Sequence, residues 1–309
     1  MIQDIEDIIG IGGSFSKLCP DYEYRKEQLD MAKAVSEAIL YKEKLLIEAG
    51  TGVGKSFGYL IPAIVHSIKD KPVVVSTHTI NLQSQLINKD IPLIQEVLKE
   101  TPFKTVIMKG RSNYLCLHEM DMAAGSLIFE ADKSFKQLQK WAKNTKKGDI
   151  SDLDFTFPEW YEVCCNPDTC KRQECQYYEE KCFYYKMKKD AATADIIIAN
   201  HSLFFSDLAL RLTDSKNSIL PDYGVVIFDE AHHLEDVATD IFGISFSNFR
   251  IPSLLRRIKR RKDIAISQGE FSFIEEKNDA LFNQFNVIQK QEYFFEDLYE
   301  KKDPEKIIK

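Results

Sequence analysis

The sequence predicts an α/β fold in which a parallel sheet carries helices on both faces, with a cysteine-rich insertion and a helical C-terminal segment. Short apolar runs alternate with stretches of helical spacing, at residues 73–75, 105–108, 196–199 and 225–228. A helix between successive strands lets those strands run parallel. Residues 112–189 interrupt this alternation with cysteines and aromatics, so we expect them to loop out between two strands of one sheet.

Three further elements are expected in the N-terminal part of the chain. Helical spacing predicts helices over 27–41 and 55–68, and the apolar run 45–48 between them predicts a strand. After about residue 242 the chain has helical spacing alone, with a basic run at 256–262. We therefore expect the last part of the chain to be helical.

Composition limits the class of protein. The 309 residues are 44% hydrophobic and 29% charged, with a net charge of -7, which is enough apolar material for a sizeable core. No apolar run reaches the roughly 20 residues that span a bilayer, and the acidic N-terminus does not resemble a signal peptide. We therefore expect a cytoplasmic protein that does not bind membranes. The acidic total counts mildly against a nucleic-acid binder but does not exclude one, because local charge governs a binding groove.

A glycine-rich turn joins the predicted strand to the next predicted helix. It reads Ala49, Gly50, Thr51, Gly52, Val53, Gly54, Lys55 and Ser56. Glycines let successive backbone N–H groups face phosphate oxygens, while Lys55 would reach the β- and γ-phosphates and Ser56 would bind Mg²⁺. The alternative is a turn with a chance Lys-Ser pair, which the strand before it and the helix after it disfavour. Ala49 departs from the strict pattern, which has glycine there.

An acidic strand end supplies the second half of a nucleotide site. Residues 225–228 are apolar and are followed by Asp229 and Glu230. Asp229 would hold Mg²⁺ and Glu230 would act as general base toward water; the alternative is an exposed acidic strand end. His232 fits the fourth position of a DEAH sequence, whereas we expect His233 to be a surface histidine.

These motifs resemble the superfamily 2 helicases and, among them, the DinG/XPD-type iron–sulfur helicases, over most of residues 20–240. The resemblance implies a RecA-like domain that binds ATP. Residues 24–28 resemble the family's Q motif, in which Gln28 would contact adenine beside Arg25; the alternative for Gln28 is a solvated helix residue. A second segment resembles motif Ia, which touches the DNA backbone: Thr77, His78 and Thr79.

The resemblance also implies a domain plan. Residues 1–111 and 190–240 would form the first helicase domain, 112–189 the iron–sulfur insertion, and 241–309 the start of a helical arch domain. Nothing in the sequence resembles the second RecA-like domain that supplies arginine fingers. We therefore expect a truncated chain that binds ATP weakly and hydrolyses it poorly by itself.

Five of the seven cysteines lie between residues 164 and 182, and clustered cysteines in a cytosolic protein are typical of metal ligands. Spacing alone does not separate a zinc site from an iron–sulfur cluster. The resemblance implies one 4Fe–4S cluster on Cys116, Cys170, Cys175 and Cys182. Cys164 and Cys165 are surplus to this set: Cys165 could replace Cys170 as a ligand, and the alternative for both is a pair of buried or spare thiols. The alternative is a set of unrelated core cysteines.

The function that follows is an ATP-dependent DNA helicase, a 5′-to-3′ motor and single-strand-stimulated ATPase acting in repair or replication. Its polarity and its pathway come from the resemblance alone, as do its expected partner, single-stranded or forked DNA, and its monomeric state. Two alternatives stay open. One is a nucleotide-dependent module that grips single strands without translocating, and the other is a zinc-stabilised P-loop ATPase.

Overall fold

The computed structural model describes residues 5–19, 22–50, 52–67, 71–125, 132–213, 218–243, 247–259 and 267–283. The chain divides into two compact units, Met1–Gly243 and Ile244–Lys309. The first unit contains the sheet and the cysteine-rich insertion, and the second contains two described helices.

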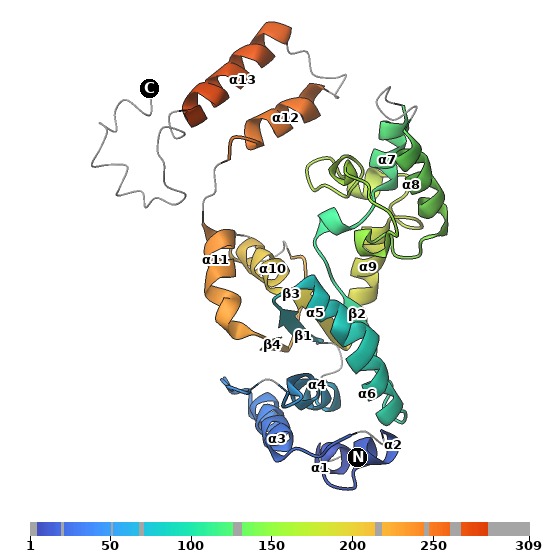
Figure 1. Cartoon of the computed structure of the whole chain (residues 1–309), viewed down its shortest axis with the longest axis vertical. Helices are drawn as coiled ribbons and strands as arrows, with labels where there is room; N and C mark the ends of the chain where they lie inside the picture. The colour runs from blue at the N-terminus through green and yellow to red at the C-terminus, as the bar shows by residue number, and fades with distance from the viewer. Residues whose placement is uncertain are drawn as a thin grey trace, which may run out of the picture. The chain divides into compact units, whose positions relative to one another are not determined.

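A parallel sheet forms the centre of the first unit and confirms the predicted fold class (Figure 1). Its strands lie in the order β2-β3-β1-β4, and every pair of neighbours is parallel. The strands are β1 (Val73–Thr77), β2 (Thr105–Ile107), β3 (Ile196–Asn200) and β4 (Val225–Phe228). Because the strands are parallel, their carboxyl ends meet at one edge, which is where open α/β sheets bind ligands.

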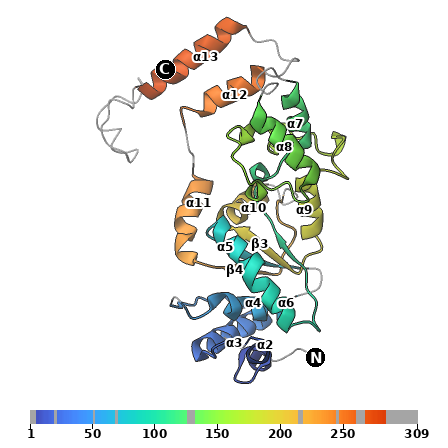
Figure 2. The same cartoon turned by 45° about the vertical axis from the view of Figure 1, so that its right-hand side comes forward.

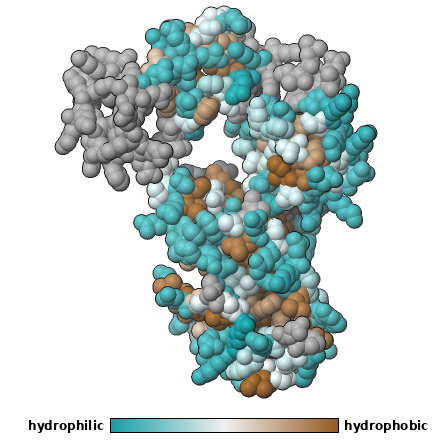
Figure 3. Space-filling model, viewed as in Figure 1, coloured by the Kyte–Doolittle hydropathy of each residue, from teal (hydrophilic) through white to brown (hydrophobic). Residues whose placement is uncertain are grey.

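The strand predicted over 45–48 was wrong. Residues 43–50 form neither helix nor strand, and Leu45 and Leu46 are 46% and 91% exposed. Hydrophobic surface is visible on this segment between α3 and α4 (Figure 3). The central strand β1 is already paired by β3 on one side and β4 on the other, so the apolar run has no partner in the middle of the sheet.

The N-terminal helices cover one face of the sheet. Alternate strand residues point to opposite faces, and Val73, Val75, Ile196 and Ile198 share a buried aliphatic core with these helices. The helices are α1 (Ile5–Ile9), α2 (Ser14–Leu18), α3 (Lys26–Tyr41), α4 (Lys55–Val65), α5 (Ile80–Gln85), the π-helical turn Leu86–Asp90 and α6 (Ile91–Val97). Helices were predicted close to the bounds of α3 and α4.

The other face carries a more aromatic core. Val74, Ile197 and Ala199 belong to a cluster that extends into the insertion between β2 and β3. Figures 1 and 2 show α7, α8 and α9 of this insertion gathered together. The helices on this side are α7 (Leu117–Ala124), α8 (Lys133–Asn144), α9 (Phe183–Ala191) and α10 (His201–Thr213). Short 3-10 turns connect them, at Arg111–Asn113, Ile150–Asp152, Trp160–Glu162 and Arg172–Glu174.

Two polar contacts hold the insertion where it leaves the sheet. Lys109 Nζ donates to Asp149 Oδ2 at 2.5 Å, and both side chains are buried. Trp160 Nε1 donates to the carbonyl of Ser112 at 2.7 Å while its ring packs in the aromatic core. The insertion therefore has a core of its own that continues into the core of the sheet.

After β4 the chain forms the 3-10 turn Ala231–His233 and α11 (Leu234–Phe242), which ends the first unit. The second unit contains α12 (Arg250–Lys259) and α13 (Gln268–Asn283), with Leu255 and Phe271 buried. The predicted basic run is described only as far as Lys259, and 284–309 lie outside the described residues. Among the helices that are described, none is long and apolar enough to cross a membrane.

Candidate nucleotide site and cysteine pocket

The two predicted carboxylates lie at the carboxyl edge of the sheet. Asp229 directly follows β4, and its backbone N–H donates to the carbonyl of Ser76 in β1 at 2.8 Å. Glu230 has a φ of 56°, in the left-handed region that side chains other than glycine rarely adopt. The left-handed conformation costs about 1–2 kcal/mol for a residue with a Cβ. Residues that keep such a strained backbone are frequent at functional sites.

The glycine-rich turn and the acidic strand end meet through one ion pair. Lys55 Nζ donates to Glu230 Oε1 at 2.9 Å, and the two side chains are 30% and 33% exposed. The hydrogen bond from Lys55 lowers the pKa of Glu230 below its ordinary value, and the same bond raises the pKa of Lys55. Residues far apart in the chain therefore share one half-open site, as the motifs predicted.

Asp229 is held by a partner that the sequence analysis did not single out. The Tyr59 hydroxyl donates to Asp229 Oδ2 at 3.1 Å from within α4. Burial raises the pKa of Asp229 and also raises the pKa of Tyr59 well above its ordinary value. Tyr59 lies in an apolar stretch, so its sequence context suggested a core residue only.

The glycine-rich turn is fixed from α3. Gly52 and Gly54 have φ values of 85° and 83°, and Gln28 Nε2 donates to the carbonyl of Gly54 at 3.0 Å. The positive φ of Gly54 strains any residue with a Cβ, and a Cβ there would also lie 2.1 Å from Gln28 Nε2 and displace that side chain. The Tyr22 hydroxyl donates to Gln28 Oε1 at 2.9 Å, and Gln28 is buried, which contradicts the alternative of a solvated helix residue. Thr51 lies outside the described residues.

The remaining predicted nucleotide residues are less constrained. Arg25 pairs with exposed Glu23 at 3.4 Å. Gly50 is exposed, whereas Val53 and Ser56 are half-buried. Contacts of Gln28 and Arg25 with adenine stay predictions.

The predicted DNA-contacting segment follows β1 directly. Thr77 is buried at the end of the strand, and Thr79 Oγ1 accepts from Leu82 N at 3.2 Å as the N-cap of α5. The ring of His78 stacks on the ring of His233, with centroids 3.7 Å apart and planes at 17°. His233 is half-buried, so the expected surface histidine is partly covered by a ring from a distant segment of the chain.

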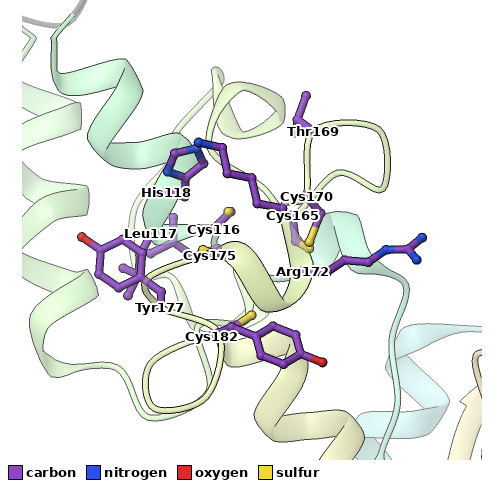
Figure 4. A pocket seen from close by; sticks show the side chains of 13 residues that line it. Cys116, Leu117, His118, Cys165, Thr169, Cys170, Arg172, Cys175, Tyr177 and Cys182 are labelled. Atoms are coloured by element: carbon purple, nitrogen blue, oxygen red, sulfur yellow. The ribbon is translucent and has the colours of Figure 1, made fainter.

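Five cysteines line one pocket in the insertion, and Figure 4 shows their sulfur atoms around it. They are Cys116, Cys165, Cys170, Cys175 and Cys182. The first immediately precedes α7 and the last immediately precedes α9. Cys164 is not among them; it is buried, with its thiol 3.6 Å from the carbonyl of Tyr161.

Burial shapes the chemistry of this pocket. It raises the pKa values of Cys116 and Cys165 to about 12. Arg111 Nη1 lies 3.9 Å from Cys165 Sγ, and its guanidinium sits 4.3 Å from the centre of the Tyr184 ring. Thiol donors suit iron–sulfur clusters and zinc alike, so the residue types fit either group. Within the described ranges, no three histidine, cysteine, aspartate or glutamate side chains form a group that could hold a metal ion.

Comparisons with known proteins identify the family of the chain. The DEAD_2 family model matches residues 77–251, more than half of the chain. ATP-dependent DNA helicase YoaA of Haemophilus influenzae is 37% identical over 261 residues, which is 82% of this chain and 40% of that protein. A protein of Bacillus subtilis named 3'-5' exonuclease DinG is 34% identical over 81% of this chain and 27% of its own length.

Among solved structures, XPD_Helicase superposes with a TM-score of 0.48 and 16% identity, covering 90% of this chain and 45% of that one. The chain spans at most about 40% of the length of the curated relatives named above. Family membership rests on the sequence match, which begins at the last residue of β1 and includes the insertion and the acidic end of β4. The chain belongs to the DEAD_2 family.

Proposed function

We propose that this chain is the ATP-binding part of an ATP-dependent DNA helicase of the DinG/XPD type. The observation that carries the proposal is the 2.9 Å contact between Lys55 and Glu230. It joins a glycine-rich turn before a helix to an acidic strand end, and a P-loop NTPase needs these two parts together. The names of the relatives support ATP as the nucleotide and DNA as the polymer.

The geometry suggests how the site responds to nucleotide. Without a ligand, Lys55 and Glu230 neutralise one another in a half-exposed position. A bound γ-phosphate would compete for Lys55, and Glu230 would then be free to orient water as general base. Ser56 and Asp229 are the proposed Mg²⁺ ligands, and Mg²⁺ would offset charge on the transferred phosphate. The left-handed backbone of Glu230 aims its side chain toward Lys55.

The proposed DNA partner would pass the carboxyl edge of β1. Thr77, His78 and Thr79 lie there, and the stack of His78 on His233 links this segment to the acidic strand end. We infer single-stranded or forked DNA, 5′-to-3′ polarity and a monomeric state from the family resemblance, and a cytoplasmic location from the sequence composition. The domain plan of 1–111 with 190–240, 112–189 and 241–309 is part of the same proposal.

The cysteine pocket is the proposed site of a 4Fe–4S cluster on Cys116, Cys170, Cys175 and Cys182. Its support is that all of these thiols line one pocket although Cys116 is far from the others in the chain. Cys165 lines the same pocket and stays an alternative to Cys170, and zinc stays an alternative to iron. The cluster would supply cross-links between the ends of α7, α9 and the loop between them.

Equilibrium binding of a fluorescent ATP analogue tests the nucleotide site. We expect binding by the unsubstituted chain in Mg²⁺ and a loss of at least about tenfold in affinity on Lys55→Ala, because a charge-assisted phosphate contact is removed. Lys44→Ala is the matched control, since Lys44 is exposed near the same turn. Equal affinity of the Lys55→Ala and Lys44→Ala variants would contradict the proposal.

Metal analysis of the anaerobically purified chain tests the pocket. We expect iron and sulfide in the unsubstituted protein and in Cys164→Ser, because Cys164 does not line the pocket. Cys182→Ser should lose the iron. Comparing Cys165→Ser with Cys170→Ser decides which of the two is a ligand, and zinc without iron would overturn the cluster.

A further inference from the structure

A tyrosine outside the predicted motifs lies at the end of a hydrogen-bond chain that reaches the glycine-rich turn. The Tyr22 hydroxyl lies 2.9 Å from Gln28 Oε1 and 2.9 Å from the carbonyl oxygen of Ile9, the buried last residue of α1. Gln28 Nε2 in turn donates to the carbonyl of Gly54 at 3.0 Å. The turn is therefore connected to α1 through two side chains.

The direction of each bond in this chain follows from what the groups can donate. The carbonyl of Gly54 can only accept, so the amide nitrogen of Gln28 faces it and the amide oxygen faces Tyr22. Burial raises the pKa of Tyr22, so its hydroxyl keeps the proton that it donates. Both ends of the Gln28 amide thus have partners inside the fold, and because Gln28 is only 3% exposed, little of it is open to a base.

The ring of Tyr22 is held independently of its hydroxyl. Its centroid lies 5.3 Å from that of Phe15 in α2, and the ring of Phe15 meets the ring of Phe57 edge-on at 5.0 Å. Phe57 belongs to the first turn of α4, so this row of rings joins the segment before α3 to the helix that follows the glycine-rich turn. A phenylalanine at position 22 would keep these contacts and lose only the hydroxyl.

Gly54 is the point at which this chain of bonds can affect a phosphate. It directly precedes Lys55 and Ser56, and its carbonyl also accepts from Gly58 N at 3.2 Å, the first backbone bond of α4. A glycine loses more conformational freedom than other residues when it is fixed in one conformation. Contacts that already hold the turn in place spare the ligand that cost, and binding becomes tighter.

We propose that Tyr22 is a positioning residue of the glycine-rich turn, which acts through Gln28 on the Gly54 carbonyl so that the turn binds the phosphates of a nucleotide whatever its base. This inference rests on the proposed function and deepens it. It assigns Gln28 to the phosphate end of the nucleotide, whereas the motif resemblance places Gln28 against adenine. The two assignments differ in their consequence for a ligand that has phosphates but no base.

Calorimetric titrations of the 309-residue chain in Mg²⁺, with adenylyl imidodiphosphate and with inorganic tripolyphosphate, separate these assignments. We expect Tyr22→Phe to weaken the binding of both ligands by the same factor, about threefold to tenfold, the effect of one hydrogen bond. Tyr41→Phe, which removes the hydroxyl of a tyrosine that is 72% exposed at the end of α3, is the matched control and should change neither affinity.

Three results of these titrations would overturn the proposal. The first is unchanged affinity of Tyr22→Phe for both ligands. The second is weaker binding of adenylyl imidodiphosphate alone, which would assign the chain of bonds to the base. The third is an unsubstituted chain that binds adenylyl imidodiphosphate but not tripolyphosphate, because recognition would then depend on the base. An unsubstituted chain that binds neither ligand would instead overturn the proposed function, and this inference with it.

Two further measurements separate positioning from a general loss of stability. Since Tyr22 would act through Gln28, Tyr22→Phe should add nothing to the loss that Gln28→Met already causes for both ligands. In the free protein, Tyr22→Phe should quicken hydrogen exchange at the amide of Gly58, which donates to the Gly54 carbonyl, and leave the amides of β1 unchanged. Full additivity, no change at Gly58, or equal quickening in β1 would each contradict the proposal. If Gln28→Met does not fold, the titrations and the exchange rates of Tyr22→Phe decide the question.

Discussion

Two lysine–carboxylate pairs in this protein have the same chemistry and different surroundings. In the insertion, Lys109 and Asp149 are 2.5 Å apart, with side chains 5% and 10% exposed. At the carboxyl edge of the sheet, Lys55 and Glu230 are 2.9 Å apart, with side chains 30% and 33% exposed. Burial is therefore the main difference between a pair that holds the insertion and a pair that could open for a ligand.

The partners of each pair support this distinction. Lys109 Nζ also donates to Ser151 Oγ at 2.8 Å, and Asp149 Oδ1 accepts from the backbone of Ser151 at 2.9 Å. The buried pair is thus saturated with hydrogen bonds from its own loop. Among the described residues, the Glu230 carboxylate has Lys55 at 2.9 Å and His232 Nδ1 at 3.6 Å, so a phosphate competing for the lysine would have few contacts to break.

The largest expected effect comes from breaking the buried pair. Lys109→Met keeps the apolar stem but leaves Asp149 charged and buried without its cation, so we expect the free energy of unfolding to fall by about 3–5 kcal/mol. Urea denaturation measures this loss. Lys147→Met, which removes an exposed lysine near the same turn, is the control and should change stability by less than about 0.5 kcal/mol.

A second substitution identifies the cause of that loss. Asp149→Asn on the Lys109→Met background removes the stranded charge while its side-chain oxygen can still accept from Ser151. About half of the lost stability should return, because the unpaired charge and not the missing contact is the larger part of the penalty. No recovery would show that the lost hydrogen bonds of Lys109, and not the unpaired charge of Asp149, account for the loss.

The sequence predicted the sheet and the convergence of Lys55 with Asp229 and Glu230 for one physical reason. Apolar β-branched runs identify buried parallel strands, and parallel strands bring their carboxyl ends to one edge whatever the chain length between them. The insertion between β2 and β3 followed from the same alternation. The run at 45–48 failed because apolar composition alone does not show whether a strand has a neighbour to pair with.

The unpredicted site residues depend on contacts between distant segments. Tyr59 lies in a helical stretch where a tyrosine suggests core packing. The stack of His78 on His233 and the bond from Gln28 to Gly54 likewise join residues with no common sequence motif. Only a tertiary arrangement reveals such partners, since local periodicity reports burial and not neighbours.

The dependence of stability on pH should distinguish buried His201 from half-exposed Glu230 at the carboxyl edge of the sheet. His201 is fully buried against Ser76 Oγ at 2.7 Å, and burial lowers its pKa to about 4. The pKa of His201 in the unfolded chain is about 6.5, so below this pH the imidazole is protonated in the unfolded chain but stays neutral in the folded chain. The free energy of unfolding therefore falls as the pH drops from about 6.5 toward 4. At pH 5 this amounts to roughly 2 kcal/mol.

The measurement compares urea unfolding at pH 7.5 and pH 5, without nucleotide or Mg²⁺, for the unsubstituted chain and His201→Gln. The variant should lose roughly 2 kcal/mol less over this interval. Glu230 does not produce the same signal, because its pKa is lowered and its contribution is lost only as the pH falls through that lower value. Parallel losses in the two proteins would show that another group titrates there.

The smallest expected change in stability comes from the open pair, and it completes the test of the comparison. Lys55→Met removes the same charge as Lys109→Met, but water reaches Glu230 and can solvate the carboxylate that is left. We therefore expect the free energy of unfolding to change by less than about 1 kcal/mol, the range of half-exposed ion pairs. Urea denaturation at neutral pH measures it, with Lys44→Met as the matched control. A loss as large as that of Lys109→Met would mean that Lys55 is bound into the fold, and a phosphate could not then take it from Glu230 at the low cost that the proposed mechanism requires.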